Sequence, residues 1–228
     1  MCGRYMSTTP PQAVAEHFGV DQIHLEDDLE PRWNVAPTLP IMAVAESRST
    51  GLRKLGTFRW GLDGTGKLIN ARAETVASRP AFRESFARRR CIIPADGFYE
   101  WKAKQPHLIA HADGSLLAFA GLWATWQQGD LRTCAIVTTE ANSAIADLHN
   151  RMPVVLPEQA WDAWLDPDNH DAVALAGLLV PAPPDEFVVR PVSRLVNNVK
   201  NEGPELLAPP EPEPEPESEP NVLLPLFE

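Results

Sequence analysis

The chain has 228 residues, of which 44% are hydrophobic and 22% charged, so it can bury a sizeable core, and disorder over its whole length is excluded. Its formal net charge of −11 argues, taken alone, against a nucleic-acid partner, because phosphate binding depends on clustered Lys and Arg. The three cysteines are too few and too scattered for a disulfide framework or a zinc ribbon. No apolar run approaches the roughly 20 residues of a membrane span. We expect a cytoplasmic protein without a cofactor or metal.

The acidic charge is concentrated at the carboxyl end, where Pro and Glu alternate over residues 209–217. From Glu205 onward there are seven acidic residues and no Lys or Arg, so residues 1–204 hold 24 acidic against 20 basic residues, a formal charge of −4. A Pro-Glu repeat cannot build a core, and its like charges and polyproline II preference extend it. We therefore expect one ordered domain over residues 1–204 and a disordered tail over residues 205–228.

The first predicted element is a short helix, because Thr9-Pro10-Pro11-Gln12 has the form of a capping box and Gly19 is a stop signal. A second helix is expected over about residues 78–88, with two phenylalanines toward the core and the arginines between 79 and 90 mostly outward. A third is expected over residues 157–165. Short strands are expected at residues 91–93, 98–101, 116–119, 133–139, 154–156 and 187–192. This order lacks regular βαβ alternation and predicts an α+β fold with a curved antiparallel or mixed, barrel-like sheet.

Cys2 has the most distinctive chemistry, because removal of Met1 would leave one residue with a free α-amine and a thiol on adjacent carbons. Their reference pKa values, about 7.7–8.0 and about 8.5, leave both nucleophiles partly available near neutral pH. An aldehyde would condense with the amine to a Schiff base, and the thiol would then close a five-membered thiazolidine ring. The competing interpretation is a frayed terminal residue without a role.

Motifs along the whole chain resemble those of the SOS-response-associated peptidase (SRAP) family. In chain order they are Met1-Cys2-Gly3-Arg4-Tyr5, Trp33-Asn34-Val35-Ala36-Pro37-Thr38, Arg59-Trp60-Gly61-Leu62, Ile69-Asn70-Ala71-Arg72-Ala73-Glu74-Thr75, Ala95-Asp96-Gly97-Phe98-Tyr99-Glu100-Trp101-Lys102, Val137-Thr138-Thr139, His149-Asn150-Arg151-Met152-Pro153, and Val192-Ser193 through Val196-Asn197-Asn198. The resemblance spans residues 2–204. One departure is the stretch 63–67, which is short and lacks a tryptophan that many relatives have there.

The resemblance implies a protein of the DNA damage response that recognises abasic sites in single-stranded DNA. It would bond its N-terminal cysteine to the ring-opened sugar aldehyde and shield the lesion from strand cleavage, a lyase-like Schiff-base chemistry. Glu100 is the candidate general acid and base, on the strand face opposite Tyr99 and Trp101. His149 is suited to moving protons, and the Asn70 amide to fixing Cys2 in an attack geometry.

Arginine is the best match for DNA, because its planar fork bonds phosphate oxygens and its face stacks on bases. Three arginines lie within two residues of a proposed catalytic position. Trp60 has two interpretations, core packing or stacking beside the lesion, and the basic run between residues 79 and 90 is more typical of a solvated helix face. Cys91 and Cys134 are expected to be inert core thiols. The DNA-contact candidates are Arg4, Asn34, Trp60, Arg72, Thr139 and Arg151.

The chain ends in an apolar peptide after the acidic repeat, a pattern typical of docking ligands. Leu223, Leu224, Leu226 and Phe227 resemble the short peptides that bind the bacterial replication sliding clamp. The alternatives are a peptide that folds back onto the domain or one without a role.

Two other functions compete with crosslinking. The first is a cysteine peptidase of the N-terminal nucleophile kind, which would use Cys2, His149 and a carboxylate, either on other substrates or only for self-removal of Met1. The second is a non-catalytic reader of single-stranded DNA. Nothing in the sequence indicates more than a monomer.

Overall fold

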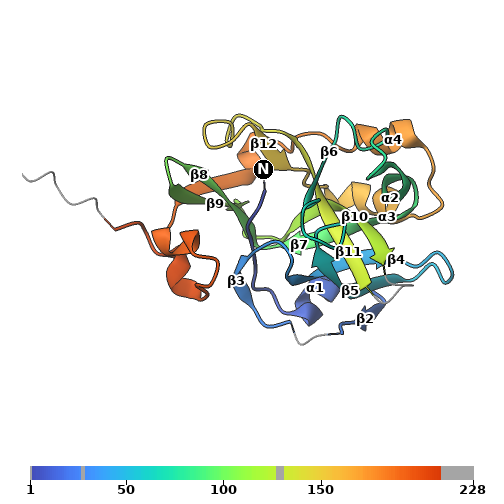
Figure 1. Ribbon diagram of the computed structural model, residues 1–228, viewed down its shortest axis with the longest axis horizontal. Helices are drawn as coiled ribbons and strands as arrows, with labels where there is room; N and C mark the ends of the chain where they lie inside the picture. The colour runs from blue at the N-terminus through green and yellow to red at the C-terminus, as the bar shows by residue number, and fades with distance from the viewer. Residues whose placement is uncertain (1, 27–28, 127–130, 212–228) are drawn as a thin grey trace, which may run out of the picture.

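The computed structural model describes residues 2–26, 29–126 and 131–211, which form two β-sheets and a few short helices (Figure 1). In chain order the strands are β1 (Tyr5–Ser7), β2 (Gln22–His24), β3 (Arg32–Val35), β4 (Pro40–Glu46), β5 (Arg53–Trp60), β6 (Asn70–Arg72), β7 (Arg90–Ala95), β8 (Gly97–Lys102), β9 (Gln105–His111), β10 (Leu117–Trp126), β11 (Leu131–Glu140), β12 (Arg151–Pro153) and β13 (Phe187–Pro191). The α-helices are α1 (Pro11–His17), α2 (Arg83–Arg88), α3 (Trp161–Leu165) and α4 (Ala172–Gly177). The 3₁₀ helices are η2 (Glu158–Ala160), η3 (Pro184–Glu186), η4 (Arg194–Asn197) and η5 (Pro204–Leu207).

The larger sheet closes on itself. Its strands follow the order β12-β11-β10-β7-β4-β5-β2, and β11 also pairs in parallel with β5 and with β6. The closing pairs are Thr133 with Arg59 and Cys134 with Trp60. The wall of a barrel is therefore formed by β11, β10, β7, β4 and β5. The predicted α+β fold with a barrel-like sheet is confirmed. The second sheet has the order β13-β9-β8-β1-β3.

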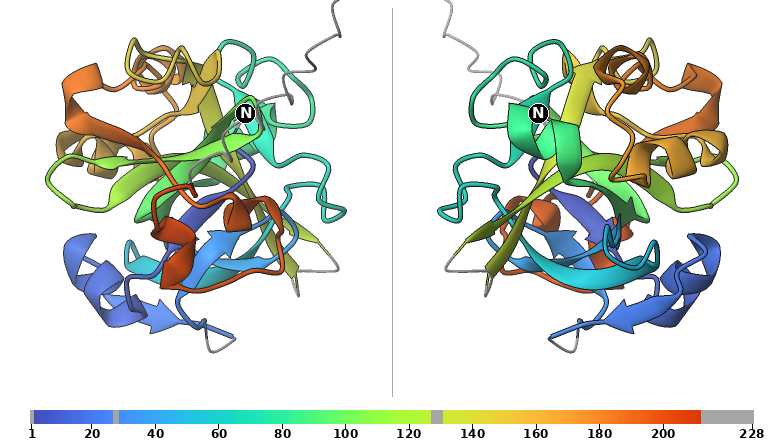
Figure 2. Two further views of the ribbon diagram at one scale, coloured as in Figure 1. Left: turned by 90° about the vertical axis from the view of Figure 1, so that its left-hand side faces the viewer. Right: turned by 90° about the vertical axis from the view of Figure 1, so that its right-hand side faces the viewer.

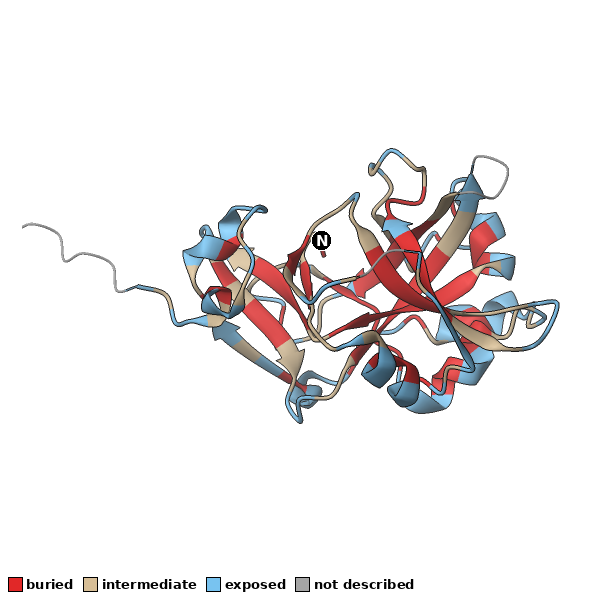
Figure 3. Cartoon of the chain, turned by 90° about the horizontal axis from the view of Figure 1, so that it is seen from below, coloured by how far each residue is buried: buried red, intermediate tan, exposed pale blue. Residues whose placement is uncertain are grey.

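The barrel strands are buried on both faces, and each face belongs to a different core. Phe119 on β10 and Ile136 on β11 point into the barrel, where they form an inner core that also contains Cys2. Ala120 and Val137, their neighbours along the strands, pack outward against the helices in an outer core. Figure 3 shows the buried residues gathered along the strands and the exposed ones on helices and loops.

Several predicted boundaries are wrong for identifiable reasons. Thr9 is not a helix cap: its hydroxyl donates to Oδ1 of Asp96 over 2.6 Å, and α1 begins without a side-chain cap. Asp96 also accepts the backbone N–H groups of Thr8 and Thr9, so a tertiary acceptor replaces the local one. The second helix is shorter than expected, the third is divided between η2 and α3, and the strand predicted at residues 154–156 lies at β12 instead, with Val155 in an isolated bridge to Phe119.

The ordered domain continues past the predicted boundary at residue 204. Leu206 in η5 is wholly buried, in a third cluster with Tyr99 and Val196. The carbonyl of Leu207 accepts a 2.8 Å hydrogen bond from Arg190 on β13. The predicted docking peptide at residues 221–228 lies outside the described residues. Among the described helices, none combines the length and apolarity needed to cross a membrane.

Candidate functional site

Cys2 lies where the two sheets meet. Strand β1 pairs on one side with β8 and on the other with β3, and it leads the amino terminus to the inner core (Figure 1). Cys2 is wholly buried there. Burial raises the pKa of its thiol, and the nearby Glu100 carboxylate raises it further. The sulfur is therefore held as a neutral thiol at physiological pH.

Asn70 fixes the backbone of Cys2. Its side-chain Nδ2 donates a 2.8 Å hydrogen bond to the carbonyl oxygen of Cys2. Asn70 opens β6, and its position follows from the parallel pairing of that strand with Ile136 on β11. The side-chain Oδ1 of Asn70 is buried and has no hydrogen-bond partner among the described residues, so it can accept one further proton donor.

Glu100 faces the same space from β8. Phe98, two residues before it, packs in the inner core with Cys2, whereas Tyr99 packs in the third cluster on the opposite side of the strand. The predicted alternation around Glu100 is thus confirmed. The side chain is only 4% exposed, and burial raises the pKa of its carboxyl group, although the charge of His149 opposes that shift. The raised pKa makes Glu100 a candidate proton donor and acceptor.

His149 lies in the turn that precedes β12, and its imidazole is oriented by the backbone. Its own backbone N–H donates to the carbonyl of Ile145, and its Nδ1 accepts the backbone N–H of Arg151 over 2.9 Å. A neutral His149 therefore carries its proton on Nε2, as a donor. Four separate segments of the chain supply Cys2, Asn70, Glu100 and His149. The hydrogen bond between Asn70 and Cys2 and the electrostatic effects of Glu100 on Cys2 and of His149 on Glu100 show that these residues lie close together.

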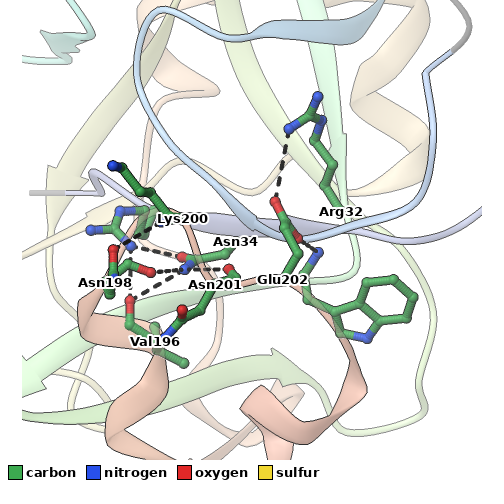
Figure 4. A network of polar contacts seen from close by, with 9 residues as sticks. Arg32, Asn34, Val196, Asn198, Lys200, Asn201 and Glu202 are labelled. Carbon is green, nitrogen blue, oxygen red and sulfur yellow. Dashed lines mark hydrogen bonds and ion pairs between the residues drawn. The ribbon is translucent and has the colours of Figure 1, made fainter.

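Arg4 and Asn34 belong to a hydrogen-bond network that binds the segment 196–201 (Figure 4). The guanidinium of Arg4 donates to Oδ1 of Asn34 over 2.7 Å and lies 5.7 Å from the ring centre of Trp101. Nδ2 of Asn34 lies within hydrogen-bonding distance of the carbonyls of Val196, Asn198 and Asn201. Asn34, predicted to contact DNA, is wholly buried here, and its amide is bound within the chain. Figure 2 shows this segment, in red, beside β3, in blue.

Trp60 is also part of the core, which decides between its two interpretations. It is wholly buried, its ring packs edge-on against Tyr5 at 5.4 Å between centroids, and its Nε1 donates to the carbonyl of Ile69. A base cannot stack on it. Thr139 on β11 is nearly buried as well, at 4% exposure.

Two of the predicted arginines lie at the rim of the site. Arg72 ends β6 with an exposed side chain. Arg151, at the start of β12, binds both carboxylate oxygens of Glu74 and the carbonyl of Thr138. Glu74 was missed as a partner of Arg151, although it stands two residues after Arg72 in the same motif. The guanidinium of Arg151 is therefore held in one orientation beside His149.

Comparison with known proteins gives the class of this chain. It belongs to the SOS response associated peptidase (SRAP) family, whose profile matches residues 1–199. It is 40% identical over 223 residues to the abasic site processing protein YoqW of Bacillus subtilis (strain 168), covering 91% of this chain and 99% of YoqW. It is 34% identical over 229 residues to the abasic site processing protein YedK of Escherichia coli (strain K12), covering 92% of this chain and all of YedK.

The fold recurs in solved structures. A protein from Bacteroides thetaiotaomicron aligns with a TM-score of 0.78 at 23% identity, covering 91% of this chain and 99% of that one. A phage-related protein from Bordetella bronchiseptica aligns with a TM-score of 0.69 at 30% identity, covering 84% of this chain and 94% of the other. The family resemblance found in the sequence motifs is thereby confirmed.

Proposed function

We propose that this protein processes abasic sites in single-stranded DNA by bonding Cys2 to the ring-opened sugar. The observation that carries the proposal is the meeting of Cys2 with Asn70 and with the raised-pKa carboxyl of Glu100. The names of YoqW and YedK as abasic site processing proteins support the same substrate. Arg72 and Arg151 at the rim would bind the phosphates on either side of the lesion.

The reaction requires the α-amine of Cys2, so removal of Met1 comes first. Hydrolysis of the Met1–Cys2 peptide bond consumes one water, releases methionine and leaves the free amine. We propose that Cys2 and Glu100 carry out this step themselves, which gives the peptidase interpretation a role on the protein's own chain. The buried Oδ1 of Asn70 would then accept a hydrogen bond from the new amine and direct its lone pair.

The bond to DNA forms in two stages. The amine nitrogen attacks the aldehyde carbon C1′, and the resulting carbinolamine loses its hydroxyl as water to give an imine. Glu100, whose buried carboxyl group holds its proton more strongly than an exposed one, supplies the proton that lets the hydroxyl leave. The sulfur then adds to the imine carbon and its proton passes to the nitrogen, which closes the thiazolidine with one water released overall. The raised pKa of the thiol favours this order, because sulfur enters as a neutral thiol after the amine.

The test uses the mature full-length protein and a single-stranded oligonucleotide with one abasic site. We expect a covalent adduct that survives heating in denaturant, with intact mass and peptide mapping locating it at residue 2. A chain that retains Met1 should give none. Cys2→Ser, prepared with Met1 already removed, has the free amine but cannot close the ring, so its adduct should persist only after borohydride reduction of the imine. A heat-stable adduct from Cys2→Ser would refute the thiazolidine, and reversible binding alone would favour the non-catalytic reader.

The clamp contact of Leu223, Leu224, Leu226 and Phe227 stays a proposal based on sequence alone. A pull-down with purified sliding clamp should lose its signal when residues 221–228 are deleted. Equal capture by the full and the shortened chain would contradict it.

A further inference from the structure

Trp126, at the end of β10, presents an indole ring to solvent and is nevertheless fixed in place. The residue is 46% exposed. Its Nε1 lies 2.7 Å from the carbonyl oxygen of Leu62 and 3.2 Å from the hydroxyl of Thr133, and that hydroxyl itself donates to Leu62 over 2.9 Å. An exposed aromatic ring usually loses rotamer entropy when it binds a ligand. Here the hydrogen bonds have already selected one orientation.

The ring rests on the loop that leads into the site. In this loop Oδ1 of Asp63 accepts the backbone N–H groups of Thr65, Lys67 and Leu68, and its Oδ2 accepts the hydroxyl of Thr65. A Cβ placed on Gly64 would lie 3.9 Å from the indole Cγ of Trp126, so the ring packs directly on the loop. Two residues after Leu68 the chain reaches Asn70, which holds Cys2. This is the loop that lacks a tryptophan of its own.

The register of β11 sets how far apart Trp126 and Asn70 lie along the sheet. Leu131 pairs with Trp126, and Ile136, five residues further along β11, pairs with Asn70. At about 3.3 Å per residue this separation is roughly 17 Å. A protein groove that binds single-stranded DNA covers roughly 4–16 nucleotides, and the separation between Trp126 and Asn70 fits within that length of DNA.

Positive charge accompanies the ring. Arg59 pairs with Thr133 across β5 and β11, on the same sheet face, and its side chain is exposed. Lys67 is exposed in the loop beneath the indole. The carboxylate of Asp63 is occupied by the four hydrogen bonds that shape the loop. A fixed aromatic face beside two exposed cations is the combination that binds a nucleobase and its phosphates without sequence preference.

We propose that Trp126, Arg59 and Lys67 form a stacking platform for one nucleotide of the single strand that flanks the abasic site. The platform rests on the proposed function for the identity of the strand. The base stacks on the Trp126 indole, and the neighbouring phosphates bind Arg59 and Lys67. The indole on β10 thus supplies the aromatic surface that the 63–67 loop does not contain.

The test measures the affinity of the full-length chain for undamaged single-stranded oligonucleotides, which requires no chemistry at Cys2. Loss of one stacked base weakens binding by about 5- to 150-fold, so Trp126→Ala should do so, while Trp126→Phe keeps most of the affinity. Thr133→Val removes part of the anchor and leaves the ring, so it should weaken binding less than Trp126→Ala does. Arg59→Glu should weaken binding and flatten its dependence on salt.

The position of the platform is tested with abasic oligonucleotides shortened one nucleotide at a time from either end. The difference in affinity between Trp126→Ala and the unchanged chain should vanish when the oligonucleotide is shortened from one end and persist when it is shortened from the other. Equal affinities of the two proteins for long strands would overturn the platform. So would equal losses in Trp126→Ala, Trp126→Phe and Thr133→Val, because the indole would then act only through the loop. If no covalent product forms with any oligonucleotide while the affinity difference remains, the proposed function fails and the platform stands.

Discussion

The guanidinium of Arg4 and the amide of Asn34 bind each other over 2.7 Å, and both also bind the backbone carbonyl of Val196. Arg4 stands two residues after Cys2, whereas Val196 lies in η4 near the end of the domain. The chain next to Cys2 is therefore held by a segment nearly 200 positions away. Positioning of Cys2 depends on this closure as well as on Asn70.

Asn34→Ala should destabilise the fold by about 1–3 kcal/mol, because it leaves buried carbonyl groups and the Arg4 guanidinium without a partner. Urea unfolding measures the change. Asn198→Ala is the matched control: its exposed side chain accepts one local N–H, from Lys200, and the loss should be about 0.5 kcal/mol or less. Equal losses in the two variants would show that the buried network adds nothing beyond a surface amide.

Asn70→Ala should slow formation of the covalent adduct by about 10- to 100-fold, because the Cys2 backbone loses the hydrogen bond that fixes it. The rate is measured in a single turnover at saturating abasic DNA. Affinity for undamaged single strands should stay within about twofold, since Asn70 acts on Cys2 and not on the phosphates. A parallel drop in affinity with an unchanged rate at saturation would assign Asn70 to DNA binding instead.

Two of the strands that the sequence does not predict, β4 and β5, are buried on both faces. In β5, Leu55 packs on the outer core and Phe58 on the inner core, and the intervening Gly56 and Thr57 are buried too. Such strands lose the alternation of apolar and polar residues by which a strand is recognised. By contrast, β8 has one face toward Cys2 and the other toward the third cluster, and its alternation placed Glu100 correctly.

Long-range polar partners set a second limit on prediction. Asn34 stands in a recognisable motif, but its acceptors lie about 160 positions later, and no spacing rule connects them. Trp126 gave no signal either, because an aromatic residue at a strand end is usually read as part of the core. The chemistry proposed for Cys2, by contrast, needs no long-range partner to be suggested, because it depends on a single residue type at one position.

Arg90 corrects the prediction of a mostly outward basic run between residues 79 and 90. It is 3% exposed, and its guanidinium donates to the carbonyls of Phe86, Trp164, Asp166 and Asn169. Arg90→Met should therefore cost at least about 3 kcal/mol of stability, measured by urea unfolding, because four carbonyls, of which those of Phe86 and Trp164 are bound in the interior, lose a charged donor.

Arg88 is the matched control for Arg90, because it lies two residues earlier, at the end of α2, and its side chain is exposed. Arg88→Met should change the free energy of unfolding by no more than about 0.5 kcal/mol. Comparable losses from both substitutions would mean that the four carbonyl contacts of Arg90 are exchanged for water without penalty.

Glu100 should make stability fall as the pH rises. Burial holds its pKa above the value of about 4.3 expected for the unfolded chain. Below pH 4 both states are protonated and the group contributes no difference. Between the two pKa values the unfolded chain releases a proton that the folded chain retains, so the free energy of unfolding declines by up to about 1.4 kcal/mol per pH unit. Above the raised pKa the carboxyl group is ionised in both states, so the loss in the free energy of unfolding stays constant.

Glu100→Gln removes this penalty and the catalytic proton together. Its free energy of unfolding should match that of the unchanged chain at pH 4 and exceed it at pH 8, while adduct formation is largely lost. His149→Ala serves as the complementary variant, because the charge of His149 lowers the pKa of Glu100 and its loss should extend the declining range to higher pH. Urea unfolding at half-unit steps from pH 4 to 8 measures both curves. A difference between Glu100→Gln and the unchanged chain that shrinks toward pH 8 would contradict a raised pKa, and with it the assignment of Glu100 as the proton donor to the carbinolamine.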